Sequence, residues 1–161
     1  MSELNELVTN FKKEHDECEI NLQDNGYSAT ISLGPMEMKL LIQPGSQMLV
    51  IQVPVGILPK TDREEFMMSL LDANDFFAGT NGFTLGINKE AEIVTLQTVW
   101  NISYLSQEYF SNLVENTFIE GTSWLEKFSL EKTDNETSDK TTSETPASTG
   151  LPNGPEQWLK I

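Results

Sequence analysis

The chain has 161 residues and an acidic composition, with 10 lysine and arginine residues against 25 aspartate and glutamate residues and a formal net charge of −15. So acidic a surface repels nucleic acid and anionic lipid, which excludes both as main partners and favours cationic ones. The single cysteine excludes an internal disulfide, and no apolar run forms a signal peptide or approaches the roughly 20 residues of a membrane span, so we expect one cytoplasmic domain without membrane insertion.

An N-terminal helix and four strands are predicted first. Ser2 can cap a helix with an apolar stripe at helical spacing, formed by Leu4, Leu7, Val8 and Phe11. Runs that alternate apolar and polar residues follow over 18–22, 27–33, 36–42 and 48–54. The turn Asp24-Asn25-Gly26 between the first two runs is a strong hairpin signal. The pattern predicts an antiparallel meander that ends near Pro54.

A second helix is predicted after Pro59. Thr61 can accept a hydrogen bond as its N-cap, and Glu64, three residues later, can reach back to complete a capping box. The apolar face of this helix comprises Phe66, Met67, Leu70 and Leu71. Polar residues occupy most of the opposite face, so we expect an amphipathic helix.

A second hairpin and a third helix complete the predicted domain. Two alternating runs, 83–88 and 93–100, flank a polar loop and predict paired antiparallel strands. A helix then begins at Ser103 or Ser106, with an apolar seam formed by Phe110, Leu113, Val114, Thr117, Leu125 and Phe128. Gly121 lies within this helix and weakens it by about 1 kcal/mol relative to alanine, a cost that a close packing contact would explain.

The order of these motifs carries a family resemblance. Val55-Gly56 and Leu58-Pro59 precede a helix that ends in LLDAN, and the hairpin contains GFTLGIN, KEA and EIVTLQ. This order resembles the Tir-chaperone-like (CesT/SycE-type) family of type III secretion chaperones over residues 4–128. The resemblance implies an α+β fold of helix, antiparallel meander, helix, antiparallel hairpin and helix, in a small, acidic, homodimeric protein of the bacterial cytoplasm.

The resemblance also implies two binding surfaces. A secreted effector protein is expected to wrap over apolar patches of the first helix and the meander, near Leu4, Val8, Ile31, Met38 and Leu40. A second copy of the chain is expected to pack on the central helix and the second hairpin, around Phe66, Leu70, Phe76, Phe77, Ile93 and Leu96. Adjacent aromatic residues point in different directions on a helix, so a single chain has difficulty burying both Phe76 and Phe77.

The composition changes after Phe128. Residues 129–161 are rich in serine, threonine, charged residues, proline and glycine, with almost no apolar residue before Leu151. Such a segment buries too little surface to offset the entropy lost on ordering, which predicts a domain over 1–128 and a disordered tail over 129–161. The apolar stretch Trp158-Leu159-Lys160-Ile161 is either a docking motif, a segment that folds back on the domain, or an unconstrained terminus.

The search for an active site yields one weak candidate. His15, the single histidine, lies three residues before Cys18, but no second cysteine or histidine is available for a metal site. The chain contains no phosphate-binding glycine loop and no hydrolase or metalloprotease motif. We therefore expect no catalytic residues, no cofactor and no metal.

Three hypotheses in different classes follow. The first is a type III secretion chaperone that binds the extended N-terminal segment of one or more effectors at a sheet edge and keeps them soluble and export-competent. The alternative is a regulatory or scaffold protein of the same fold, without a role in secretion, that binds a folded partner through its acidic surface and the region of Trp158. The third is a small enzyme using His15 and Cys18. It predicts that Cys18→Ser abolishes an activity, whereas both binding hypotheses predict that this substitution has almost no effect.

Overall fold

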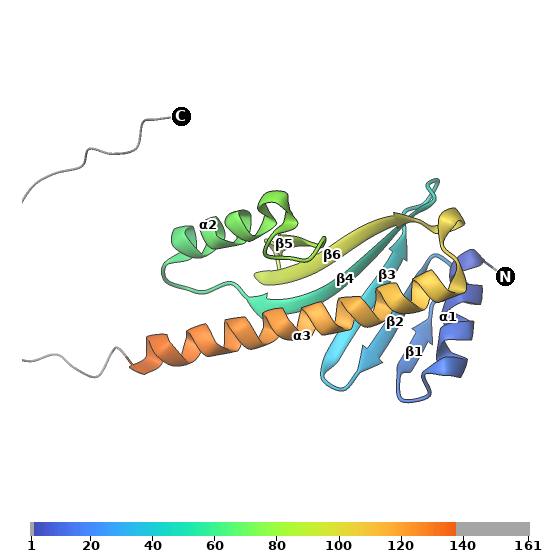
Figure 1. Cartoon of the computed structure of the whole chain (residues 1–161), viewed down its shortest axis with the longest axis horizontal. Coiled ribbons are helices and arrows are strands. Elements are labelled where there is room, and N and C mark those ends of the chain that lie inside the picture. The colour runs from blue at the N-terminus through green and yellow to red at the C-terminus, as the bar shows by residue number, and fades with distance from the viewer. Residues whose placement is uncertain (1, 138–161) are drawn as a thin grey trace, which may run out of the picture.

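The alternating runs form one antiparallel sheet in the computed structural model, which describes residues 2–137 (Figure 1). The strands are β1 (Glu19–Leu22), β2 (Ser28–Leu33), β3 (Met36–Ile42), β4 (Met48–Ile57), β5 (Thr84–Asn88) and β6 (Ile93–Asn101), in the spatial order β1-β2-β3-β4-β6-β5. The helices are α1 (Glu3–Glu14), α2 (Arg63–Asn74) and α3 (Gln107–Thr137), with short 3-10 helices η1 (Asp75–Phe77) and η2 (Ile102–Tyr104). The predicted α+β order of elements is confirmed.

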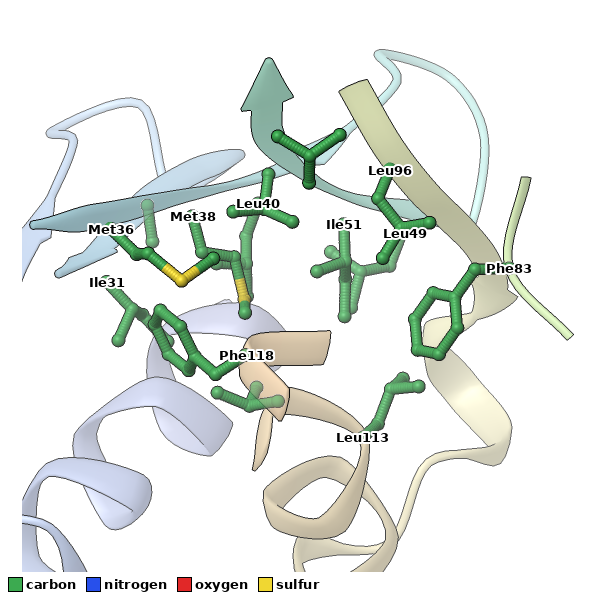
Figure 2. Packing of buried hydrophobic residues seen from close by; sticks show 14 of the residues in the cluster. Ile31, Met36, Met38, Leu40, Leu49, Ile51, Phe83, Leu96, Leu113 and Phe118 are labelled. Carbon is green, nitrogen blue, oxygen red and sulfur yellow. The ribbon is translucent and has the colours of Figure 1, made fainter. Parts of the chain in front are cut away.

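The core lies on one face of this sheet. The register pairs Leu40 with Ile51 and Val53 with Leu96, so these side chains point to the same face. Helices α1 and α3 lie across that face, and Figure 2 shows sheet side chains directed toward residues of α3 such as Phe118. The predicted apolar stripe of α1 is buried there, as are most members of the α3 seam. Burial of this face is the main source of stability, because it removes most of the apolar surface from water.

Polar side chains begin two of the three helices as predicted. Ser2 Oγ accepts a hydrogen bond from the Asn5 backbone N–H at 3.3 Å and caps α1. Ser106 Oγ accepts a hydrogen bond from the Tyr109 backbone N–H at 3.2 Å and caps α3. Of the two starting points considered for the third helix, Ser106 is therefore the correct one.

The predicted capping box of α2 is wrong. Asp62 occupies the N-cap position in a left-handed conformation, with φ of 53°, and its side chain makes no capping hydrogen bond. The N-cap therefore lies one residue after Thr61, and Glu64 is out of register for the reciprocal contact. The apolar face of α2 also differs from expectation, because only Leu70 is buried while Met67 and Leu71 are exposed.

Two elements extend further than predicted. Strand β4 continues through Pro54 to Ile57, because Pro54 lies opposite Thr95 where the β4–β6 register shifts, and proline is tolerated at such an irregularity. Helix α3 continues past Phe128, the expected domain boundary, to Thr137. Within residues 2–137, neither α3 nor any other helix combines the length and the apolar character needed to cross a membrane. The region of Trp158 lies outside the described residues.

Gly121 lies where α3 crosses the middle of the sheet. A Cβ atom at this position would lie 2.7 Å from Met36 Cε and 3.0 Å from Val53 Cγ1. These distances are shorter than van der Waals contact, so the backbone of α3 lies directly against side chains of β3 and β4. The close contact that would explain a glycine inside the helix is present.

We expect Gly121→Ala to lower the free energy of unfolding by about 1 kcal/mol, because overpacking of typically 1–3 kcal/mol exceeds the gain in helix propensity of about 1 kcal/mol. The methyl end of Met36 can move aside, whereas Val53 is held in a central strand. Urea denaturation followed by circular dichroism measures the change. The control is Asn116→Ala on the exposed side of α3, which should stabilise by a few tenths of a kcal/mol. An equal gain for Gly121→Ala would contradict the close contact.

Candidate functional site

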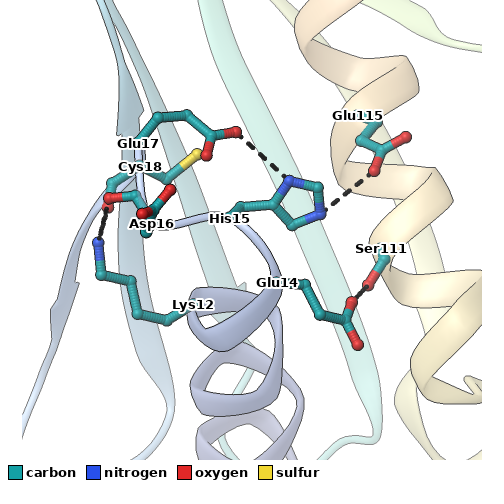
Figure 3. A network of polar contacts seen from close by, with 8 residues as sticks. All are labelled: Lys12, Glu14, His15, Asp16, Glu17, Cys18, Ser111 and Glu115. Atoms are coloured by element: carbon teal, nitrogen blue, oxygen red, sulfur yellow. Dashed lines mark hydrogen bonds and ion pairs between the residues drawn. The ribbon is translucent and has the colours of Figure 1, made fainter.

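His15 and Cys18, the residues considered for catalysis, do not face each other. His15 follows the last turn of α1, and its ring stacks on Phe11 with centroids 4.2 Å apart. Its Nδ1 lies 3.4 Å from Glu17 Oε1 and its Nε2 lies 3.3 Å from Glu115 Oε1 on α3 (Figure 3). Both ring nitrogens therefore face carboxylates, and the side chain links the end of α1 to α3.

Further polar contacts strengthen this junction between α1 and α3. Ser111 Oγ donates a hydrogen bond to Glu14 Oε2 at 3.3 Å (Figure 3). The Lys12 ammonium donates to the backbone carbonyl of Cys18, where the chain enters β1. The pKa of the Glu17 carboxyl is lowered, first by a hydrogen bond from its own backbone and additionally by His15. The cluster therefore has a structural role in fixing the C-terminal end of α1.

The Cys18 thiol is poorly suited to nucleophilic catalysis. It is buried, and burial raises the pKa of the thiol above its ordinary value, with a further contribution from the Glu17 carboxylate. A raised pKa reduces the thiolate fraction at neutral pH, whereas catalytic thiols have lowered pKa values. In the part of the chain that the structure describes, no group of three or more His, Cys, Asp or Glu side chains is arranged to hold a metal ion.

The residues predicted to contact an effector lie inside the core. All of them have at most 1% of their surface exposed, namely Leu4, Val8, Ile31, Met38 and Leu40. The helical and strand spacing identified apolar stripes correctly, but the stripe of α1 packs against β2 and α3, and the meander is covered by α3, all within the same chain. The part of this region that reaches the surface is its outer border, strand β1, where Ile20 and Leu22 are half-buried.

Strand β1 is an edge of the sheet, and some of its backbone groups have no strand partner within residues 2–137. The Gln23 backbone N–H donates to the Ser28 carbonyl at 3.0 Å, so the backbone groups of Gln23 point toward β2. Along β1, residues whose backbone groups point toward β2 alternate with residues whose groups point away from it. By that alternation the N–H and C=O groups of Ile20 and Leu22 point away from β2, like the Cys18 carbonyl that Lys12 holds. An exposed edge of this kind can pair with another extended chain.

The opposite edge of the sheet, strand β5, is covered by α2 at one residue. The Asn74 side chain at the end of α2 donates from Nδ2 to the Leu85 carbonyl at 3.0 Å. Its Oδ1 accepts from the Leu85 backbone N–H at 2.8 Å. The amide therefore makes the two hydrogen bonds that a neighbouring strand would make, and it covers β5 at Leu85, the second residue of the strand. Nothing in the sequence pattern predicted this contact, because an asparagine at a helix end serves many roles.

An exposed apolar surface lies on α2 and η1. We call it the α2 surface, and its members are Met67, Met68, Leu71, Phe76 and Phe77. Phe76 is 92% exposed and Leu71 is 63% exposed. The signal for this surface was present in the sequence, because apolar residues at 67, 68, 70 and 71 cover more of a helix than one buried face requires.

The residues predicted for the dimer interface are divided between this surface and the core. Phe76 and Phe77 belong to the α2 surface. Leu70 and Leu96 are buried within the single chain, and Ile93 is half-buried on β6. Phe66 packs against Phe128 of α3 with ring centroids 5.3 Å apart. Of the six residues in this set, the structure therefore places only Phe76 and Phe77 together at the exposed surface.

Phe76 and Phe77 are also strained. Their φ angles are 47° and 57°, in the left-handed region that favours glycine. This conformation costs roughly 1–2 kcal/mol for a residue with a side chain. Two consecutive aromatic residues that are both strained and exposed are typical of a surface with a binding role.

Comparison with sequence families matches residues 6–124 to the family described as the Tir chaperone protein (CesT) family. This match spans the region from α1 to the middle of α3 and includes both sheet edges and the α2 surface. No match is found among curated protein sequences.

Solved structures share the fold at low sequence identity. A chain of the HopA1–SchA chaperone–effector complex has a TM-score of 0.59 and 11% identity, covering 77% of this chain and 94% of that one. A chain of the ExsC–ExsE complex has a TM-score of 0.56 and 16% identity, covering 78% and 96%. A chain of the heterodimeric ExoU–SpcU complex from the type III secretion system of Pseudomonas aeruginosa has a TM-score of 0.52 and 11% identity, covering 65% and 86%.

We expect Cys18 in the native chain to react with iodoacetamide near neutral pH roughly tenfold more slowly than in the urea-unfolded chain, because its thiol is buried and its pKa is raised. Mass spectrometry of quenched samples measures both rates, and N-acetylcysteine corrects for the effect of urea on the reagent. A native rate equal to or above the unfolded rate would indicate an activated thiol and would restore the enzyme hypothesis.

Proposed function

Because this chain belongs to the Tir chaperone protein (CesT) family, we propose that it is a type III secretion chaperone. It binds the extended N-terminal segment of one or more effectors in the bacterial cytoplasm and keeps them soluble and export-competent. It acts by holding this segment and performs no chemistry on it. The complexes of similar fold support the proposal, since one of them is described as a chaperone–effector complex.

The open edge of β1 is the observation that carries the proposal. An added strand would pair with the backbone groups of Ile20 and Leu22, and their half-buried side chains would give it an apolar boundary. Ile31, one of the predicted effector-contacting residues, lies on β2 directly opposite Ile20. It would therefore contact the side chain of Ile20 and would not contact the effector itself. Because Asn74 closes β5 at Leu85, β1 is the edge better prepared to receive a strand.

A second copy of the chain is the occupant that we propose for the α2 surface. A homodimer would remove Met67, Met68, Leu71, Phe76 and Phe77 from water. It would also offset the strain of the two phenylalanines, which a lone chain carries without any gain in burial. The dimer contact and the β1 edge involve different elements, so the dimer leaves the effector site open on each copy.

We expect Leu71→Glu to convert the dimer to a monomer, because a charge buried without a partner at the interface is strongly unfavourable. Multi-angle light scattering measures the mass. Ile119→Glu is the matched control, because Ile119 is 67% exposed on α3 and its replacement should leave the mass unchanged. Leu70 is unsuitable for this experiment, since a charge in the core would unfold the chain. A dimer that persists in Leu71→Glu would contradict the proposed interface.

A second expected outcome concerns the β1 edge. Ile20→Pro removes the outward N–H and should reduce the amount of effector that co-purifies with the tagged chain by about tenfold, the equivalent of one hydrogen bond of roughly 1.4 kcal/mol. The control is Ile20→Val, which keeps the N–H and an apolar side chain and should retain the effector. Circular dichroism and light scattering confirm that both variants are folded dimers. Full capture by folded Ile20→Pro would place the effector segment elsewhere.

A further inference from the structure

The open edge of β1 ends at Cys18. By the alternation of the β1–β2 ladder, the residues whose backbone groups point away from β2 are Cys18, Ile20 and Leu22. In the part of the chain that the structure describes, the outward groups of Ile20 and Leu22 have no hydrogen-bond partner. The Cys18 N–H donates to the His15 carbonyl at 3.3 Å, and the Cys18 carbonyl accepts from the Lys12 ammonium. An added strand therefore finds free backbone groups at two of these three residues.

The Lys12 ammonium takes the place of a neighbouring strand at this end of the edge. It donates to the Cys18 carbonyl and, at 3.1 Å, to the Asp16 carbonyl (Figure 3). A donor to a carbonyl that points away from the sheet lies where the N–H of an added strand would lie. A strand that continued past Ile20 would have to displace this charged group, and charged side chains at sheet edges obstruct pairing in this way.

The position of Lys12 in α1 does not by itself explain this contact. A lysine in the last turn of a helix interacts favourably with the helix C-terminus, and both Lys12 and Lys13 lie in the last turn of α1. The Lys13 ammonium donates to Asn10 Oδ1 at 2.9 Å within the same helix. Of these two lysines, Lys12 is the one that reaches the edge of β1.

A limit at Cys18 is needed because apolar alternation alone does not fix the register of an added strand. A shift by one residue turns the apolar side chains to the other face, whereas a shift by two residues keeps them on the same face. At the other end of β1 the chain turns after Leu22, and the Gly26 N–H donates to the Gln23 carbonyl at 3.0 Å. This turn and the Lys12 ammonium together bound the free part of the edge on both sides.

We propose that Lys12 sets the register of the effector strand on β1, an inference that rests on the proposed function. Lys12 is a positioning residue, since it ends the backbone pairing at Ile20 and excludes a shift of the strand toward Cys18. The free part of the edge fits an effector segment with two apolar residues separated by one other residue. These two residues lie beside the half-buried side chains of Ile20 and Leu22. The effector residue that would pair with Cys18 leaves the sheet and keeps its N–H in water.

The test is hydrogen exchange in the complex of the full-length tagged chain with its co-purified effector. Mass spectrometry with electron-transfer fragmentation measures exchange at single amides. In the wild-type complex, we expect the Ile20 and Leu22 amides to exchange at least about tenfold more slowly than in the free chain, the equivalent of one hydrogen bond each.

Lys12→Met removes the ammonium, keeps most of the aliphatic stem and frees the Cys18 carbonyl. In the complex of this variant we expect one further effector amide to slow by about tenfold, because it can donate to the Cys18 carbonyl. This amide should lie two residues beyond the paired stretch on the Cys18 side. A purely structural role of Lys12 would not add a protected amide to the effector.

Two control variants separate this role from general effects of charge and helix stability. Lys13→Met removes the same charge from the same turn of α1 and should leave the wild-type exchange pattern unchanged. Lys12→Arg keeps a charged donor and should also retain the wild-type pattern. Circular dichroism and light scattering confirm that all three variants are folded dimers.

Two results would overturn the inference, namely an unchanged effector pattern in Lys12→Met and an equal gain of protection in Lys13→Met. The inference and the proposed function fail in different ways. If the Ile20 and Leu22 amides slow but Lys12→Met adds no protected amide, only the role of Lys12 is wrong. If an effector binds without slowing these two amides, the β1 site is wrong, and the role of Lys12 with it. If no effector co-purifies, the chaperone function itself is wrong.

Discussion

The close contact between α3 and the sheet at Gly121 is the constraint on which the rest of the structure depends. It sets the backbone of α3 directly on β3 and β4, and from that position α3 meets both other helices. Glu115 contacts His15 at the end of α1, and Phe128 packs against Phe66 of α2. The apolar stripe of α1 is thereby held within the core of its own chain. Among the described residues, the β1 border of the sheet and the α2 surface are left exposed to partners.

The two edge strands of the sheet differ in how their backbone groups are covered. This difference places the proposed dimer contact and the proposed effector site on different elements. At β5 the Asn74 amide replaces a neighbouring strand, so that α2 is anchored there and presents its apolar residues outward. At β1 the backbone groups of Ile20 and Leu22 have no such cover within residues 2–137. A dimer built on α2 and an effector bound at β1 therefore do not compete for the same elements. This arrangement allows one assembly to hold two copies of the chain and an extended segment together.

Most of the fold could be predicted from the sequence, because strand alternation and the hairpin turn at Asn25-Gly26 are local signals. The features that were missed depend on tertiary contacts. The N-cap of α2 is Asp62 and not the predicted Thr61, and β4 continues beyond Pro54. In both places the neighbouring strand and loop determine the local backbone. The site was harder to predict for the same reason. Helical spacing placed Leu4 on an apolar stripe. Spacing alone does not show whether a residue of such a stripe faces its own core or a partner.

The measurement that tests the central claim most directly is native mass spectrometry of the tagged chain purified from its source bacterium. If the chain is a dimer that holds an effector segment, the main species will contain two copies of the chain and one secreted protein. Recovery of the chain alone, or of a complex with a protein that is not secreted, would contradict the account. In the second case the fold and the α2 surface would remain as described, but the regulatory or scaffold hypothesis would replace the chaperone function.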